Sequence, residues 1–335
     1  MSVYHYIRSV WAFFIKMLFR YIIRFYRFLK GRIILSFDLH CHTRLSNGSL
    51  GIEDLILLAK KRGVETIAIT DHDCLAGTVR GKVIGERLGI NVIPGVELTG
   101  TDKTNGQEIH LLCYKPDFPD RLEGLCRRSS LIRKKASHFM MLKVAQRYPV
   151  TPEFVAKCAS GSTNIFKAHI MQALIETGFT NTIYGDLYKT LFSKDDENSL
   201  NFVPEYEDIF DVLTAIHDAG GIAVLSHPLR CKNPELLDKL VEAGLDGIEV
   251  YINGVTEDEK KALIKYAKKN KLLTTGGTNF KGLYNKEIVT VGDVDIPEQC
   301  VQELITYKSR KKKAARRLAA QEAQEKLAEA TSESK

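Results

Sequence analysis

Five histidines and one glutamate stand at the ends of short apolar segments of this chain or, for His110, within one, and this recurrence constrains the fold more than any other feature. The six residues are His40, His42, His72, Glu97, His110 and His227. His40 and His42 lie two positions apart, so on a strand both imidazoles point to the same side. In a β/α barrel the strand ends converge on one face, where sites are built. The pattern therefore predicts a barrel with a histidine-rich site at one end.

The body of the chain alternates β-branched segments with helical patterns from residue 33 onward. Helices are predicted at 52–62 and 257–269, and a run of helical segments occupies residues 121–218. Strands are predicted at 33–40, 65–70, 90–96, 108–114, 221–226, 247–251 and 271–276. Such alternation is typical of parallel βα units. We therefore predict an α/β fold, a distorted (β/α)7 barrel with an inserted helical cap.

The same patterns divide the chain into five zones. They are a basic aromatic amphipathic helix at 1–31, the first part of the barrel at 32–120, the helical insertion at 121–218, the second part of the barrel at 219–296, and a charged helix and tail at 297–335. The chain has 335 residues, 44% of them hydrophobic, which is enough for one large barrel with a core. The seven cysteines form no CxxC pair, which indicates reduced thiols in a cytoplasmic protein rather than a disulfide framework.

Much of the formal net charge of +7 lies at the two ends. Residues 3–30 have no uncharged stretch near the roughly 20 apolar residues of a spanning helix. Their basic and aromatic pattern favours an amphipathic helix lying on a membrane surface, with a helix docked on the body or a cleaved targeting sequence as alternatives. Residues 308–317 read KSRKKKAARR. A solvated helix is the default interpretation there and an anionic partner the alternative; without interleaved aromatic residues, no stable nucleic-acid partner is expected.

The residue types at the strand ends indicate a metal site. Imidazole nitrogen together with carboxylate oxygen suits Zn, Mn or Fe. A single strand-end histidine is more often a hydrogen-bonded structural residue, but a whole set at successive strand ends is hard to produce by chance. A carboxylate such as Glu97 can bridge two cations, and a cation pair suits phosphoester cleavage. We expect divalent transition metal ions, two per chain.

The ordered motifs resemble those of the PHP superfamily, named for polymerase and histidinol phosphatase. They lie at residues 38–42 (DLHCH), 70–73 (TDHD), 94–97 (PGVE), 109–110 (IH) and 226–228 (SHP). The insertion, with residues 166–170 (FKAHI) and 219–228, resembles that of the branch containing 3′,5′-nucleoside bisphosphate phosphatases and 5′-3′ exoribonucleases. The resemblance implies a metal-dependent phosphoesterase whose substrate is a small phosphorylated nucleoside or a short oligonucleotide.

Residue roles are carried over from this resemblance. The implied metal ligands are His40, His42, Glu97, His110, His227 and Asn279. The implied catalytic residues are His40, His42, His72, Glu97 and Lys281. Phosphate contacts are expected from Lys167, where relatives commonly have arginine, and from His169 and Lys281. Asp38, Asp71 and Asp73 are expected to orient ligand imidazoles; for Asp71 and Asp73, turn or helix-cap roles are an equal alternative.

Three positions depart from the family pattern. Asn47 and Asn279 stand where the family has aspartate, and Lys281 stands where it has a ligand histidine. Family precedent gives three cation positions: His40, His42, Glu97 and Asn279; then Asn47, His72 and Lys281; then Glu97, His110 and His227. The second position keeps only His72, and one imidazole cannot hold a divalent cation in water. We therefore predict that Lys281 replaces this cation with a fixed positive charge.

Two classes of function follow. The first is a phosphoesterase that hydrolyses a phosphomonoester or terminal phosphodiester through a metal-bound hydroxide, with Lys281 in place of one cation. The alternative is a catalytically weakened protein that binds a metal or a phosphorylated ligand at the membrane surface. Lys281 discriminates between them, because restoring histidine there and aspartate at Asn47 should raise activity only if the present site is crippled.

Overall fold

Strands occupy seven segments of the computed structural model, which describes residues 36–193 and 199–333. Residues 37–335 form one unit, separate from residues 1–36. The leader predicted at residues 1–31 lies outside the described residues, so its membrane-surface role stays a prediction. Among the described helices, none combines the length and apolar character needed to cross a membrane.

Within the described residues the seven strands form one sheet in chain order, and each of the seven segments predicted as strands overlaps one of them. They are β1 (Ser36–Cys41), β2 (Val64–Ile69), β3 (Asn91–Asp102), β4 (Gln107–Tyr114), β5 (Ile222–Leu225), β6 (Gly247–Ile252) and β7 (Leu273–Gly277). A bridge between Cys41 and Phe280 brings the end of β1 beside the segment that follows β7. Glycine is required at this closure, because a Cβ on Gly277 would lie 2.5 Å from the His40 nitrogen. The predicted barrel of seven strands is confirmed.

The expectation of parallel pairing throughout is wrong at β4. This strand pairs antiparallel with both β3 and β5. The four residues 103–106 that join β3 to β4 can form a hairpin, whereas a parallel pair needs a crossover of a dozen or more residues. The pairs β2–β3, β5–β6 and β6–β7 are parallel.

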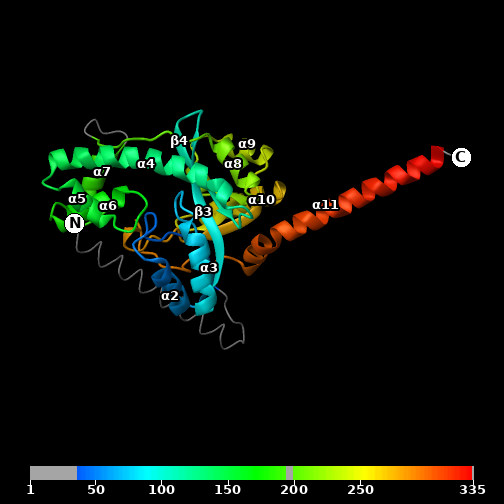
Figure 1. Cartoon of the computed structure of the whole chain (residues 1–335), viewed down its shortest axis with the longest axis horizontal. Helices are drawn as coiled ribbons and strands as arrows, with labels where there is room; N and C mark the ends of the chain where they lie inside the picture. Colours follow the sequence, from blue (N-terminus) through cyan, green and yellow to red (C-terminus); the bar gives the residue numbers. More distant parts are fainter. Residues whose placement is uncertain (1–35, 194–198, 334–335) are drawn as a thin grey trace. The chain divides into compact units, whose positions relative to one another are not determined.

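Helices connect the parallel strands and cover the sheet. They are α2 (Ile52–Arg62), α3 (Ala76–Leu88), α9 (Leu236–Glu242) and α10 (Glu257–Lys269), and short 3-10 turns lie at Pro228–Arg230 and Gly282–Tyr284. Local sequence sets their limits: α10 begins with a capping box between Thr256 and Glu259, and α2 ends at Gly63 with a positive φ of 69°. Helices α2 and α3 lie side by side over one part of the sheet (Figure 1).

The segment between β4 and β5 is helical. It holds α4 (Asp120–Arg147), α5 (Pro152–Cys158), α6 (Lys167–Glu176), α7 (Asp186–Phe192) and α8 (Ile209–Asp218). The end of α4 packs with α5, α6 and α7 in an apolar cluster of its own, which includes Val144, Ile170 and Leu191. Helix α8 instead buries Ile209 and Val212 in the cluster shared with the strands. The cap cluster is therefore formed by α4 to α7, while α8 belongs to the barrel wall.

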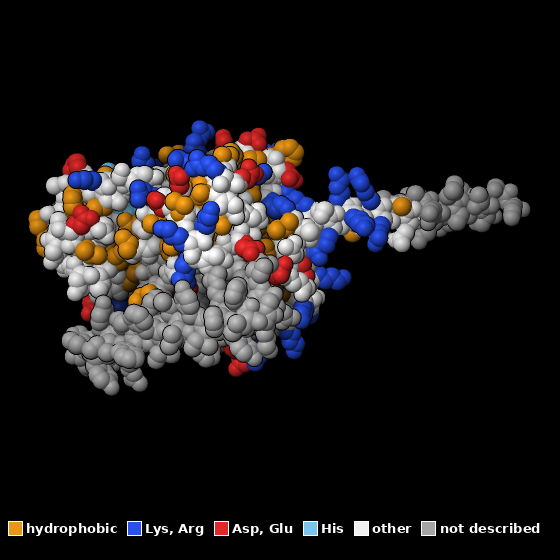
Figure 2. Space-filling model, turned by 90° about the horizontal axis from the view of Figure 1, so that it is seen from below, with side chains coloured by type: hydrophobic (Ala, Val, Ile, Leu, Met, Phe, Trp, Pro, Cys, Tyr) orange, Lys and Arg blue, Asp and Glu red, His pale blue; other side chains and the backbone are white. Residues whose placement is uncertain are grey.

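The chain ends in α11 (Glu298–Glu333), which begins on the barrel. Val301 and Leu304 are buried, and helix contacts reach β7. Residues 309–317 are mostly exposed, and their Lys and Arg side chains gather along the described part of this helix in Figure 2. The basic sequence is thus displayed to solvent rather than packed into the fold.

Candidate metal centre and phosphate pocket

The end of β1 brings His40 and His42 against Glu97 of β3. The Nε2 atoms of His40 and His42 lie 3.3 and 3.2 Å from Glu97 Oε2, and all three side chains are buried. Burial opposes charge on Glu97, but His72, His40 and His110 hold its pKa well below the usual range. Burial, with Lys281 nearby, lowers the pKa of His42 to about 3, so this imidazole is neutral and can donate a lone pair to a metal.

A second set of donors shares the same carboxylate. His72, Glu97 and His110 place their ligand atoms within 4.8 Å of one another, as do His40, His42 and Glu97. His72 Nδ1 lies 3.3 Å from Glu97 Oε2, and the His42 and His72 rings stack with centroids 4.6 Å apart. Family precedent left His72 as the one ligand kept at the second position; in the structure the short β3–β4 hairpin brings His110 beside it.

Glu249 of β6 is a partner that the sequence interpretation missed. Its Oε1 lies 2.9 Å from His40 Nδ1, and its Oε2 accepts from Ser226 Oγ at 2.9 Å and from the His227 backbone nitrogen at 3.0 Å. Burial opposes charge on His40, but Glu249 and Glu97 raise its pKa to about 10. The signal was present in the sequence, because a glutamate interrupts the apolar strand GIEVYI.

His227 lies with His40 and Glu249. It does not lie with His110, with which family precedent grouped it in the third cation position. Its donor atoms group with those of His40 and Glu249. Its Nε2 accepts a hydrogen bond from the amide nitrogen of Asn279 at 2.6 Å, and Asn279 Oδ1 accepts from the ammonium of Lys281. Burial lowers the pKa of Lys281 to about 8, so the ammonium remains charged at neutral pH. Asn279, which was expected as a ligand beside His40 and His42, thus contacts His227 and Lys281.

The three aspartates expected to orient the imidazoles accept hydrogen bonds from other residues. Asp71 accepts from Thr43 and from Ser46 Oγ at 2.6 Å, and this hydroxyl lies 3.4 Å from His42 Nδ1. Asp73 accepts from the backbone nitrogen and hydroxyl of Thr99 at 3.0 and 2.8 Å. Asp38 accepts from Thr278 in the loop after β7 and from Gly292. Asp71 therefore holds the loop after His42, Asp73 joins the residue after His72 to β3, and Asp38 holds the segment after β7.

Backbone strain marks the same loops. Asp73, His227 and Asn279 have φ values of 48°, 48° and 50°. Non-glycine residues adopt this left-handed region rarely, and such conformations persist where surrounding structure enforces them, often at functional sites. The strain therefore agrees with a site whose side chains are held in fixed directions.

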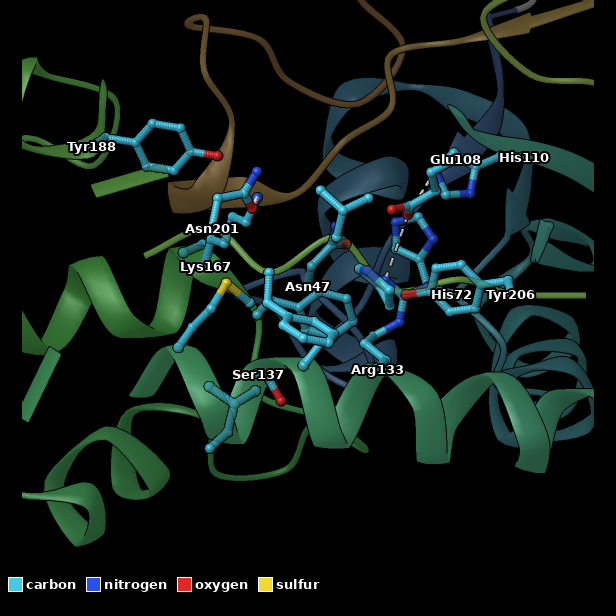
Figure 3. Close-up of a pocket in the computed structure, with 18 of the residues that line it drawn as sticks. Asn47, His72, Glu108, His110, Arg133, Ser137, Lys167, Tyr188, Asn201 and Tyr206 are labelled. Carbon is cyan, nitrogen blue, oxygen red and sulfur yellow. Dashed lines mark hydrogen bonds and ion pairs between the residues drawn. The ribbon is translucent and has the colours of Figure 1, made fainter. Parts of the chain in front are cut away.

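A cavity of about 290 Å³ opens beside the histidines. His72, His110, Glu108 and Arg133 lie at one end, and Lys167, Asn201 and Tyr188 lie toward the other (Figure 3). The wall also includes Asn47, Lys281, Phe166, Met140 and Tyr206. Cations and aromatic rings thus line one cavity. Its volume is close to the lower end of the range of about 300–1,000 Å³ for small-molecule sites.

The two insertion residues expected to contact phosphate lie differently. Lys167 lines the cavity and donates to Asn201 Oδ1 at 2.7 Å. His169 is buried, and its Nδ1 accepts from the Phe166 backbone nitrogen at 3.1 Å. Since His169 caps α6 and is not among the residues that line the cavity, we do not retain it as a phosphate contact.

The donors fit a divalent transition metal at the two groups that share Glu97. Asn47 Oδ1 is buried without a hydrogen-bond partner in the described residues, and His72 Nδ1 makes no hydrogen bond there although Glu97 Oε2 lies 3.3 Å away; both residues line the cavity. Unsatisfied buried acceptors are costly unless a ligand or ion completes them. At His227, by contrast, the Asn279 amide already occupies Nε2, so the fit is poor there.

Comparisons with known proteins agree with this geometry. The PHP domain model matches residues 38–223. A phosphoribosyl 1,2-cyclic phosphate 1,2-diphosphodiesterase of Eggerthella lenta is 32% identical over 252 residues, which cover 74% of this chain and 95% of that protein. A 3′,5′-nucleoside bisphosphate phosphatase of Chromobacterium violaceum is 26% identical, with coverage of 72% and 86%.

A 5′-3′ exoribonuclease of Haemophilus influenzae is 27% identical, over 73% of this chain and 89% of its own length. A solved structure from Bifidobacterium adolescentis, described as a metal-dependent phosphoesterase, superposes with a TM-score of 0.72 at 26% identity. It covers 82% of this chain and 96% of that one. Sequence motifs, barrel, clustered histidines and relatives converge, and the chain belongs to the PHP domain family.

Proposed function

We propose that this chain is a metal-dependent phosphoesterase that hydrolyses a phosphomonoester or terminal phosphodiester of a small nucleotide-like substrate. The observation that carries the proposal is one cavity whose wall holds His72 and His110 of the metal centre together with Arg133, Lys167 and Lys281. The names of three relatives support it, since each acts on a phosphate ester: a cyclic phosphate, a nucleoside bisphosphate or RNA.

The cofactor we propose is a pair of divalent transition metal ions, Mn, Zn or Fe. His40 and His42 would hold one, His72 and His110 the other, and Glu97 would contact both. Bound there, such ions supply Lewis acidity toward the phosphate and lower the pKa of water. Glu249 accepts from His40 Nδ1, while Nε2 faces Glu97; a metal bound there would replace the Nε2 proton and leave the Nδ1–H form that Glu249 holds.

Lys281 takes the place of a further cation in this proposal. Its ammonium lines the cavity and is held by Asn279. A fixed positive charge in a partly buried wall stabilises the charge on phosphate oxygens but cannot activate water. At the far end of the cavity Lys167, held by Asn201, supplies a second charge for an anionic group of the substrate.

A second function is favoured by the contact between Asn279 and His227. Because this amide occupies a ligand nitrogen, the site could bind a metal or phosphorylated ligand without turnover. Such a protein would be a weakened member of the family, as the three departures from the family motifs suggest. It would bind the same ligands but release no phosphate.

Phosphate release from a panel of substrates separates the two functions. The panel contains a nucleoside 3′,5′-bisphosphate, a cyclic phosphate ester and a short 5′-phosphorylated oligonucleotide, each with Mn²⁺ and with a chelator. The proposal predicts metal-dependent turnover of at least one substrate and a large loss in Lys281→Met. The double variant Asn47→Asp, Lys281→His should gain nothing. A gain in that variant over an inactive wild type would favour the binding protein.

A further inference from the structure

A single cation stands on the buried face of the helix that crosses from the barrel to the cap. Along α4 the buried residues recur every three or four positions and include Leu125, Ser129, Ala136 and Met140. Arg133 occupies the same stripe, and its side chain is 11% exposed. A charged side chain is rarely buried to this degree unless it is paired.

The partners of Arg133 come from the barrel rather than from the cap. Its Nη2 donates to Asp73 Oδ2 and to Thr99 Oγ1, each at 2.7 Å, and its Nη1 lies 3.8 Å from Glu108 Oε1. The guanidinium also lies between two rings, 5.3 Å from the centroid of Phe166 and 5.2 Å from that of Tyr206. Burial opposes its charge, but Asp73, Tyr206 and Glu108 raise its pKa further.

Each of these barrel partners leads to a histidine of the metal centre. Thr99 Oγ1 lies 3.5 Å from His110 Nδ1, and Glu108 Oε1 lies 3.3 Å from His110 Nε2. Asp73 directly follows His72 and is held at a positive φ of 48°. One guanidinium therefore contacts groups on both sides of the His110 ring and the residue beside His72.

We propose that Arg133 is a positioning residue that sets the His72 and His110 side of the metal centre and links it to α4 of the cap. The planar fork suits this task, because it holds three acceptors in fixed directions, which a lysine ammonium cannot do. This inference rests on the proposed metal centre, since the two histidines are its donors. Through Arg133, the position of α4 affects how tightly the two histidines hold a metal, and a bound metal in turn fixes the position of α4.

The test compares Mn²⁺ affinity by calorimetry in the full chain. The variants are Arg133→Gln, Arg133→Lys and the matched control Arg128→Gln, an arginine of the same helix whose ion pair with Glu207 is exposed. Partners that orient metal ligands typically change affinity about 10–100-fold. We expect a loss of this size in Arg133→Gln, a smaller loss in Arg133→Lys and none in the control. In turnover assays kcat should fall more than KM rises.

A second variant guards against misfolding of Arg133→Gln. Thr99→Val removes the hydroxyl that joins Arg133 to His110, and its effect on Mn²⁺ affinity should not add to that of Arg133→Lys, since both act on one contact. The inference is overturned if a folded Arg133→Gln binds Mn²⁺ with an affinity within twofold of wild type. It is also overturned if the losses of affinity in Thr99→Val and Arg133→Lys add up in the double variant. A raised KM with unchanged kcat also overturns it, because Arg133 then binds substrate. A wild type whose Mn²⁺ affinity depends on Arg133 in this way, yet which releases no phosphate, would reject the proposed function alone.

Discussion

At the scale of single residues, Glu249 is the group that orients the proposed metal centre. This buried carboxylate accepts from His40 Nδ1, Ser226 and the backbone of His227, so it ties β1 to the end of β5. Burial opposes its charge, but His40 lowers the pKa of Glu249 to about 2. A carboxylate that accepts a hydrogen bond from Nδ1–H leaves Nε2 of the imidazole for a metal.

Replacing this carboxylate should weaken metal binding. In Glu249→Gln we expect an about 10–100-fold loss of Mn²⁺ affinity, because the neutral amide holds His40 less firmly. Calorimetric titration with Mn²⁺ measures it. Glu257→Gln makes the same chemical change at an exposed glutamate of α10 and should leave the affinity as in wild type. Equal affinities in the two variants would contradict the role given to Glu249.

The sequence predicts part of this site, for physical reasons that differ between residues. His40, His42 and His72 stand at strand ends, where a barrel brings them together. Arg133 was missed although it stands on the buried stripe of α4, where a charge needs partners. The contact between Asn279 and His227 depends on side-chain directions at the closure of the barrel, which no local pattern encodes.

At the scale of elements, one of the contacts that join the last helix to the barrel is made by a buried carboxylate. Asp246, just before β6, accepts from Tyr307 of α11 at 2.6 Å, from the Ala223 nitrogen at 3.0 Å, and lies 3.1 Å from His217 Nε2. Burial opposes its charge, but these hydrogen bonds hold the pKa of Asp246 below its ordinary value.

The direction of a strand was harder to predict than its position. The alternation of apolar residues located β4, but the short β3–β4 hairpin decided that it runs antiparallel.

Removing the Tyr307 hydroxyl should loosen the contact between α11 and the barrel. Tyr307→Phe deletes a hydrogen bond to a buried carboxylate, and we expect a loss of about 1–2 kcal/mol in the free energy of unfolding. Urea denaturation measures it. The control is Tyr148→Phe in the cap, since no hydrogen bond of that hydroxyl occurs within the described residues. A loss no larger than in the control would show that α11 docks through its apolar residues alone.

At the scale of the whole molecule, the proposed metal centre fastens four strands together. Its donors come from the ends of β1 and β2 and from within β3 and β4, so the site forms only in the folded barrel. A ligand that binds the folded state alone stabilises it, by about 2.7 kcal/mol at one hundred times its dissociation constant.

Mn²⁺ should therefore raise the melting temperature of the chain by several degrees over a sample with chelator. Thermal denaturation followed by circular dichroism measures the shift. Glu97→Gln removes the carboxylate common to both donor groups and should abolish most of it. A shift that persists in Glu97→Gln would place the metal elsewhere in the chain.

The central claim, a two-cation phosphoesterase with Lys281 as an additional fixed charge, is tested most directly by elemental analysis of the purified chain. Phosphate release from a nucleoside 3′,5′-bisphosphate is measured on the same sample. The account predicts about two transition metal ions per chain, with turnover lost and metal content reduced in His40→Ala. Metal near zero, or two ions per chain without turnover of any phosphoester in the panel, would contradict it.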